Sequence, residues 1–139
     1  MTSSLRVLIV EQNLLRQRLQ AQSIKQLKHH VKCVNTAWDA IDQCFDNRYD
    51  VIVMNNELSD MGGEDLVKRL RTVERESGVE DHSAFIAVVC HETDDATTTR
   101  ILAAGASEVY TSPVSMEPML NFASNWVLVR DAVADWVLV

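Results

Sequence analysis

The chain has 139 residues, a formal net charge of −7 and a hydrophobic content of 47%. This profile is typical of one compact globular domain and excludes a disordered or fibrous chain. A chain of this length buries roughly two-thirds of its unfolded surface on folding, so its core requires no disulfide or structural metal. Because Lys and Arg form no basic stripe along the sequence, we expect no direct binding to nucleic acid.

Cysteine usage and hydropathy indicate the cellular compartment in which the protein is expected. Cys33, Cys44 and Cys90 are odd in number and lack C-x-x-C spacing, which predicts reduced and buried thiols. The N-terminus lacks a basic segment followed by a sustained apolar one, and no stretch approaches the roughly 18 apolar residues of a membrane span. We therefore expect a cytoplasmic protein without a membrane anchor.

The first half of the chain alternates apolar runs of strand length with segments of helical period, which is typical of βα units and a parallel sheet. Strands are predicted at 5–10, 31–34 and 49–54. Asn13 and Thr36 are the predicted caps of the two helices between them. The side chains expected on the buried sides of these helices are Leu15, Leu19, Ile24 and Leu27 in the first, and Ala37, Ala40, Ile41, Cys44 and Phe45 in the second.

The second half continues the same alternation and completes five βα units. The polar segment 55–60 follows the third strand, and the turn at 61–63 opens a third helix. The acidic stretch 74–83 is long for a connection and is predicted to be a mobile, solvated loop. The remaining elements are predicted at 85–89 (strand), 93–105 (helix), 108–111 (strand) and 115–139 (helix). A functional site is expected where the carboxyl ends of the strands meet.

Four segments at or near these strand ends form a specific set. They are Val-Leu-Ile-Val-Glu-Gln-Asn (7–13), Tyr-Asp-Val-Ile-Val-Met-Asn (49–55), Leu-Ser-Asp-Met-Gly-Gly (58–63) and Ala-Ala-Gly-Ala-Ser-Glu-Val-Tyr-Thr-Ser-Pro (103–113). With them the chain resembles the response-regulator receiver domain, the phosphoacceptor module of two-component signalling, over residues 5 to about 130. The resemblance implies an α/β fold: a three-layer, doubly wound (βα)5 parallel sheet of the flavodoxin-like or CheY-like type, with strand order 2-1-3-4-5. One receiver-like domain is expected over 1–139, with 131–139 extending the last helix or starting a linker.

Receiver chemistry depends on oxygen ligands and a nucleophilic carboxylate. In the family, an acidic pair after the first strand and an Asp after the third strand hold Mg²⁺, and that Asp also accepts the phosphoryl group. A Ser or Thr after the fourth strand and a Lys before the Pro after the fifth strand bind the phosphoryl oxygens. In this chain the corresponding residues are Glu11, Gln12, Asn55, Cys90 and Ser112.

These departures remove the charge that the chemistry needs. The neutral amide of Asn55 cannot form an acyl phosphate, and too few acids remain to strip water from Mg²⁺. The resemblance thus implies a receiver fold that is no enzyme, carries no cofactor and binds Mg²⁺ weakly or not at all. The vestigial metal positions are Glu11, Gln12, Asn55 and Glu57. The expected function is that of a phosphorylation-independent pseudo-receiver, which acts by protein–protein interaction in a two-component-type pathway.

Two alternatives remain open from the residues. An atypical receiver could take phosphate from a histidine kinase on another acid, Glu57 or Asp60, although Asp60 is expected to form a turn. A sensor could bind a small molecule or respond to oxidation in the neutralised pocket. The lining of that pocket would be Gln12, Asn55, Cys90 and Ser112. The Asn55 amide itself is expected to bond to Gln12 and to neighbouring backbone.

The expected interaction surface is formed by the fourth helix, the fifth strand and the fifth helix, the face that carries output and dimer contacts in the family. Its anchors are Val109, Tyr110, Met119, Trp126 and Trp136. The last helix carries more apolar side chains than its own core requires, so it either packs within the domain or docks a partner. The expected partner is a signalling protein, a fused effector or kinase domain, or a second copy of the chain.

Overall fold

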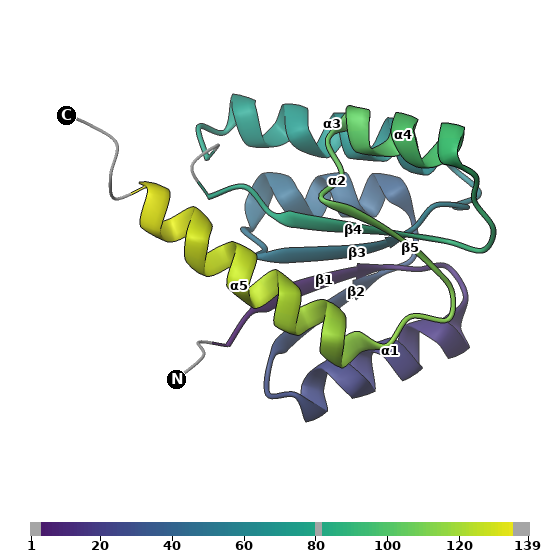
Figure 1. Ribbon diagram of the computed structural model, residues 1–139, viewed down its shortest axis with the longest axis horizontal. Helices are drawn as coiled ribbons and strands as arrows, with labels where there is room; N and C mark the ends of the chain where they lie inside the picture. The colour runs from purple at the N-terminus through teal and green to yellow at the C-terminus, as the bar shows by residue number, and fades with distance from the viewer. Residues whose placement is uncertain (1–3, 80–81, 135–139) are drawn as a thin grey trace.

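Five parallel strands and five helices alternate along the chain in the computed structural model, which describes residues 4–79 and 82–134 (Figure 1). The strands are β1 (Arg6–Val10), β2 (His30–Val34), β3 (Val51–Asn55), β4 (Phe85–Cys90) and β5 (Glu108–Thr111). The helices are α1 (Leu14–Gln26), α2 (Ala37–Asp46), α3 (Gly63–Glu76), α4 (Asp95–Ala104) and α5 (Met116–Ala134). Within the described residues, no helix is long and apolar enough to cross a bilayer.

The sheet has the order β2-β1-β3-β4-β5, and every pair of neighbouring strands is parallel. Helices α1 and α5 cover one face of the sheet, while α2, α3 and α4 cover the other (Figure 1). The predicted three-layer α/β fold and its strand order are therefore confirmed. Asn13 and Thr36 are also confirmed as caps, because their side chains accept hydrogen bonds from the backbone N–H groups of Arg16 and Asp39.

Both faces of the sheet are buried, which explains why the central strands are almost continuously apolar. Leu8, Ile52 and Ile86 are in register on neighbouring strands and face α2, α3 and α4. Their sequence neighbours Val7 and Val51 point to the opposite face and pack against α1 and α5, since successive side chains alternate along a strand.

The predicted buried side of α1 is confirmed for Ile24 and for Leu27, which packs partly buried against the core, but it is wrong for Leu15 and Leu19. Leu15 and Leu19 are exposed, and the residues of α1 that are buried are Ala21 and Ile24. Leu15 and Ile24 are separated by about two and a half turns of helix, so they lie on opposite sides of α1 and cannot form one stripe. The exposed leucines consequently form a solvent-facing apolar cluster.

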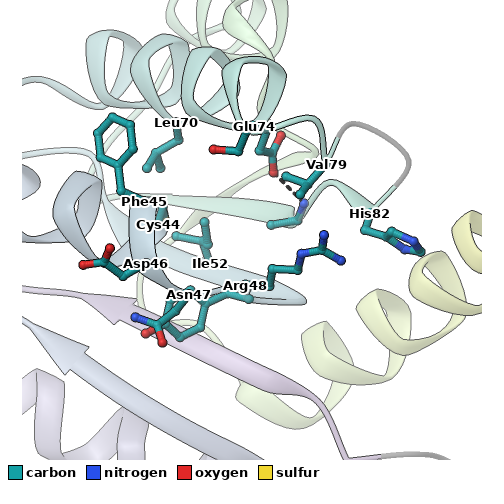
Figure 2. A pocket seen from close by; sticks show the side chains of 13 residues that line it. Cys44, Phe45, Asp46, Asn47, Arg48, Ile52, Leu70, Glu74, Val79 and His82 are labelled. Carbon is teal, nitrogen blue, oxygen red and sulfur yellow. Dashed lines mark hydrogen bonds between the residues drawn. The ribbon is translucent and has the colours of Figure 1, made fainter.

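The predictions for the region around α2 and α3 also need correction. Phe45 is exposed at the rim of a hollow of about 270 Å³ between the ends of α2 and α3 (Figure 2). Glu74 belongs to α3 and does not lie in a solvated loop. Its carboxylate accepts hydrogen bonds from Arg71 and from the backbone N–H of Ala84. Residues 80–81, which belong to the predicted loop, lie outside the described residues.

Candidate functional site

A cleft of about 630 Å³ opens at the carboxyl ends of β1, β3 and β5. It lies where the strand order switches between β1 and β3, the usual place for a binding site in an open α/β sheet. Glu11, Asn55 and Ser112 line the cleft together with Arg16 and His91. The topology thus brings these three sequence-predicted site residues, and Glu57 with them, to one opening.

Glu11 is the centre of this site. Its residue is only 3% exposed, and its carboxylate accepts a hydrogen bond from the backbone N–H of Asn13 at 3.0 Å. The Nε of Arg16 donates to Oε1 at 3.0 Å, and the Nδ2 of Asn55 lies 3.3 and 3.1 Å from the two carboxylate oxygens. A buried carboxylate needs such partners, because an unpaired charge is costly to remove from water.

Asn55 is the last residue of β3, and both the nitrogen and the oxygen of its side-chain amide bond to local partners. Its Nδ2 donates to Glu11, while its Oδ1 accepts from the backbone N–H of Glu57 at 2.9 Å. The predicted bond between Asn55 and Gln12 is wrong. Gln12 is exposed and instead accepts a hydrogen bond from the backbone N–H of Ser59 at 2.8 Å, so its side chain ties together two loops above the sheet.

Only some of the other sequence-predicted site residues lie in the cleft. Ser112 and Glu57 line the cleft, whereas Gln12 and Cys90 do not. Cys90 is completely buried among the core residues that face α2, α3 and α4. The ligand pocket expected from Gln12, Asn55, Cys90 and Ser112 is therefore wrong in half of its lining, because Cys90 turns its side chain into the core and Gln12 turns its side chain to the backbone of Ser59.

The sequence matches the response regulator receiver domain family over residues 7–123. The chain belongs to this family. It is a receiver domain of two-component signalling, in agreement with the resemblance carried by the four sequence segments. A comparison with curated proteins gives no significant match.

Solved structures share the receiver fold at low sequence identity. The Saccharomyces cerevisiae receiver domain of the response regulator Ssk1, in a co-crystal with the histidine phosphotransfer protein Ypd1, is 19% identical, with a TM-score of 0.81 and coverage of 94% of each chain. A CheY-like receiver domain protein from Methanospirillum hungatei JF-1 is 17% identical, with a TM-score of 0.80, covering 94% of this chain and 98% of that chain. A third, the receiver domain of a sensor histidine kinase from Pseudomonas aeruginosa PAO1 with magnesium in its active site cleft, is 20% identical, with a TM-score of 0.75, covering 90% of this chain and 98% of that chain.

Sequence reasoning missed one residue of the receiver site, Arg16. It lies in the first turn of α1, where the helix dipole favours acidic side chains and disfavours a cation. That turn contains no acid, and Glu11 comes shortly before it in the sequence. An arginine in this unfavourable position indicates a nearby carboxylate, and this signal could have identified the Glu11–Arg16 pair.

Asp60 does more than form the predicted turn. Its two carboxylate oxygens accept hydrogen bonds from the backbone N–H groups of Ala37 and Trp38, each at 3.1 Å. These are the first donors of α2, which have no partner within the helix. Asp60 therefore joins the loop after β3 to the N-terminus of α2.

The expected interaction surface is only partly exposed. Met119 is 3% exposed and belongs to the core, so its assignment to the surface is wrong. Val109 and Tyr110 are half-buried, and Trp126 packs edge-on against Phe85 with ring centroids 5.6 Å apart. Trp136 lies outside the described residues. The exposed large apolar side chains on α5 are Phe122, Leu128, Val129 and Val133.

The three thiols are free, and we expect them to differ in reactivity. Burial raises the pKa of Cys44 to about 12, with help from the nearby Glu74 carboxylate. Burial also raises the pKa of Cys33, but Lys25 and Lys32 oppose this rise. Because only thiolates react quickly and Cys90 is completely buried, we expect Cys33 to be labelled first in the folded protein.

A time course of alkylation at pH 8, followed by peptide mass spectrometry, measures this order. Labelling of Cys90 as fast as Cys33 without unfolding would contradict it and would favour the redox-sensor alternative. Repeating the course in denaturant provides the control, because all three thiols should then react at similar rates.

Proposed function

We propose that this receiver domain works without phosphorylation, as a module that binds other signalling proteins. The observation that carries the proposal is the pairing of the Glu11 carboxylate with the Arg16 guanidinium and the Asn55 amide. A cation of the chain itself and a neutral donor thus satisfy the acid that would otherwise contribute to a metal site.

Mg²⁺ binding would have to disrupt these contacts. The ion requires a near-octahedral set of oxygen ligands at about 2.1 Å and loses its water reluctantly. Asn55 turns its amide nitrogen toward Glu11 and uses its oxygen on the backbone of Glu57. We therefore propose that the domain holds no resident cofactor and binds Mg²⁺ weakly or not at all.

Phosphoryl transfer to Asn55 is chemically disfavoured as well. Formation of an acyl phosphate needs a carboxylate oxygen as nucleophile, which a carboxamide does not supply. Ser112 brings no positive charge to the cleft, and the guanidinium of Arg16 is already paired with Glu11. For these reasons we propose that the chain catalyses no reaction.

Recognition of another protein is the role that remains for such a domain. The Ssk1 receiver domain, which shares this fold, was crystallised with a histidine phosphotransfer protein, so the fold is suited to docking on a signalling partner. We propose that the partner here is a signalling protein, or an effector or kinase domain, that recognises the surface without a phosphorylation signal.

A second candidate function rests on the size of the cleft. Its volume of about 630 Å³ falls within the range of small-molecule sites, and apolar side chains such as Leu19 and Met116 line it beside polar ones. A thermal-shift screen detects this function as stabilisation that Ser112→Trp, which fills the cleft, should abolish. By contrast, phosphorylation of Asp60 finds no support, because its carboxylate already accepts two backbone hydrogen bonds.

A ¹H–¹⁵N NMR titration with Mg²⁺, and then with beryllofluoride as a phosphoryl mimic, tests the main proposal. We expect no saturable shift of the amide signals of Glu11, Asn55 or Ser112. Asn55→Asp serves as the positive control, because it restores one oxygen ligand beside Glu11. Asn56→Asp is the matched control, since it adds the same charge at a residue that does not line the cleft. Saturable shifts in the unmodified protein would show that receiver chemistry is retained.

A further inference from the structure

The hollow between the C-terminal ends of α2 and α3 lies at the opposite end of the sheet from the cleft, and we call it the α2–α3 hollow. Its volume is about 270 Å³ (Figure 2). Several of its lining residues precede β3 and β4 in the sequence, such as Arg48, Tyr49 and Ala84, whereas the cleft opens where the strands end. None of the described residues lines both, so the α2–α3 hollow is separate from the receiver site.

The inner part of the α2–α3 hollow is apolar. Ile52 of β3, Leu70 of α3 and Ala84 line it and are buried in the core. Phe45 of α2 lies at the rim and is 56% exposed, so a ligand that covers it removes apolar surface from water. A cavity of about 150 Å³ already accommodates benzene. The α2–α3 hollow therefore has room for one aromatic ring with a short substituent.

The polar groups in the wall of the hollow already have partners within the chain. The two carboxylate oxygens of Glu74 accept hydrogen bonds from Arg71 at 2.9 Å and from the backbone N–H of Ala84 at 2.8 Å. The hydroxyl of Tyr49 donates to the side-chain oxygen of Gln43 at 2.7 Å. These bonds hold the wall in place before any ligand enters, and they leave the choice of ligand charge to the mouth of the hollow.

Arg48 is the cationic side chain at this mouth. It is exposed, and no salt bridge among the described residues includes it. Its guanidinium extends in the direction of His82, whereas the carboxylate of Asp46 points the opposite way (Figure 2). The Nδ1 of His82 lies 3.7 Å from a carboxylate oxygen of Asp131. Arg48 thus offers its N–H donors to an anion that enters the hollow.

We propose that the α2–α3 hollow binds a small aromatic carboxylic acid, with the ring in the apolar interior and the carboxylate paired with Arg48. A planar guanidinium holds a carboxylate through two parallel N–H···O bonds, which are stronger than bonds between neutral groups. The ring would lie near those of Phe45 and Tyr49, which line the same hollow, and aromatic rings attract one another in edge-on arrangements.

The helix ends around the hollow oppose such an anion only weakly. The C-terminus of a helix is the negative end of its dipole, because its last carbonyl groups lack partners. Here the carbonyl oxygen of Gln43 accepts a hydrogen bond from the backbone N–H of Asn47 at 2.9 Å, and that of Glu74 accepts one from Val79 at 3.1 Å. Arg48 also places the carboxylate at the mouth, where salt and water screen the dipole.

This site goes beyond the proposed function, because binding there involves neither metal nor phosphoryl chemistry. Arg71 connects the wall of the hollow to α4, since it donates to Glu74, to the backbone oxygen of Ala84 and to that of Gly105. A ligand that fits only this arrangement stabilises the folded domain. The α2–α3 hollow would thus give a receiver domain that lacks a phosphoacceptor an input of another chemical kind.

A ¹H–¹⁵N NMR titration of the full chain with benzoate, at constant ionic strength, tests the site. We expect saturable shifts of the backbone amides of Cys44, Arg48 and Ala84 with a Kd of about 1 mM or lower. Benzyl alcohol, which has the ring but no charge, should bind about 10-fold more weakly, and benzylamine should cause no saturable shift. Tighter binding of benzylamine than of benzoate, or no saturable shift with benzoate up to about 20 mM, would overturn the proposal.

Three variants separate the pairing with Arg48 from nonspecific attraction. Arg48→Gln should weaken benzoate binding by about 10-fold. Arg18→Gln is the matched control, because it removes the same charge from an exposed arginine of α1 that does not line the hollow, and its affinity should be unchanged. Ser77→Trp places a large ring at the lining of the hollow and should abolish binding. Equal affinities of Arg48→Gln and Arg18→Gln would overturn the pairing, and thermal unfolding verifies that all three variants are folded.

The position of the shifts distinguishes the α2–α3 hollow from the cleft. Shifts confined to Glu11, Asn55 and Ser112 would place benzoate in the cleft and overturn the proposal. Failure of the site leaves the phosphorylation-independent role intact, because that role is tested with Mg²⁺ and beryllofluoride and not with an organic acid.

Discussion

Replacing Arg71 by methionine is expected to lower the free energy of unfolding by about 3 kcal/mol. Its side chain is only 16% exposed, and its guanidinium joins three parts of the fold. The Nε donates to the backbone oxygen of Gly105 at 2.9 Å, and one terminal nitrogen donates to the backbone oxygen of Ala84 at 2.8 Å and to Glu74 at 2.9 Å. Methionine retains most of the apolar stem but leaves these acceptors without the donor.

The cost of this substitution comes mainly from the groups left behind. Glu74 would keep its bond to the backbone N–H of Ala84 but lose its counter-charge in a half-buried position. Urea unfolding followed by circular dichroism measures the loss. Arg75→Met is the matched control on the same helix, since Arg75 is exposed and bonds only to Thr72 among the described residues. We expect it to cost about 0.5 kcal/mol or less, and equal effects of both variants would contradict the role of Arg71.

The apolar pattern of the sequence predicts the strands well because both faces of this sheet are buried, whereas the order of the strands was implied by the resemblance to receiver domains. A strand buried on both sides is an apolar run that needs no choice of face, and 49–54 and 85–89 each overlap the observed strand almost completely. For a helix, the prediction must decide which side is buried, and that decision was wrong where apolar residues occur on more than one side. Leu15 in α1 and Phe45 in α2 are exposed, since burial depends on which side of a helix meets the sheet and not on hydrophobicity alone.

The position of the candidate site could be predicted from the sequence, but the hydrogen bonds between its residues could not. Residues that follow the strands must gather at one edge of a parallel sheet, which places Glu11, Asn55 and Ser112 together. Hydrogen-bond partners depend on side-chain direction, and so Gln12 reaches the Ser59 backbone while Arg16 supplies the charge that pairs with Glu11. Apolar spacing on the last helix likewise gave no means of telling the buried Met119 from the exposed Val129.

Asn55→Asp is expected to destabilise the domain by about 2 kcal/mol at pH 7 in the absence of divalent ions. The Nδ2 of Asn55 donates to both oxygens of the buried Glu11 carboxylate, at 3.3 and 3.1 Å. Aspartate replaces this donor with an oxygen, so two carboxylates would lie within about 3 Å of each other. Arg16 relieves part of the repulsion, because its guanidinium already contacts the carboxylate of Glu11.

The pH dependence of this loss has a definite sign. Repulsion raises the pKa of the new carboxyl group in the folded state above its value of about 3.9 in the unfolded chain. The folded variant therefore binds a proton more readily than the unfolded one, and the stability difference from the unmodified protein should shrink as the pH falls from 7 toward about 4. Thermal unfolding of both proteins across this range measures the difference, and a gap that widens on acidification would contradict the repulsion.

Mg²⁺ should restore the stability of Asn55→Asp at pH 7 while leaving the unmodified domain unchanged. Two adjacent carboxylates create the oxygen-rich, negatively charged position that Mg²⁺ requires, and an ion that binds only the folded state stabilises it. Asn56→Asp adds the same charge at a residue that does not line the cleft and should respond to neither pH nor Mg²⁺ in this way. Equal stabilisation of all three proteins by Mg²⁺ would show that the ion acts elsewhere on these acidic chains. A response confined to Asn55→Asp would identify the amide at position 55 as the group that separates this domain from the metal-dependent chemistry of its family.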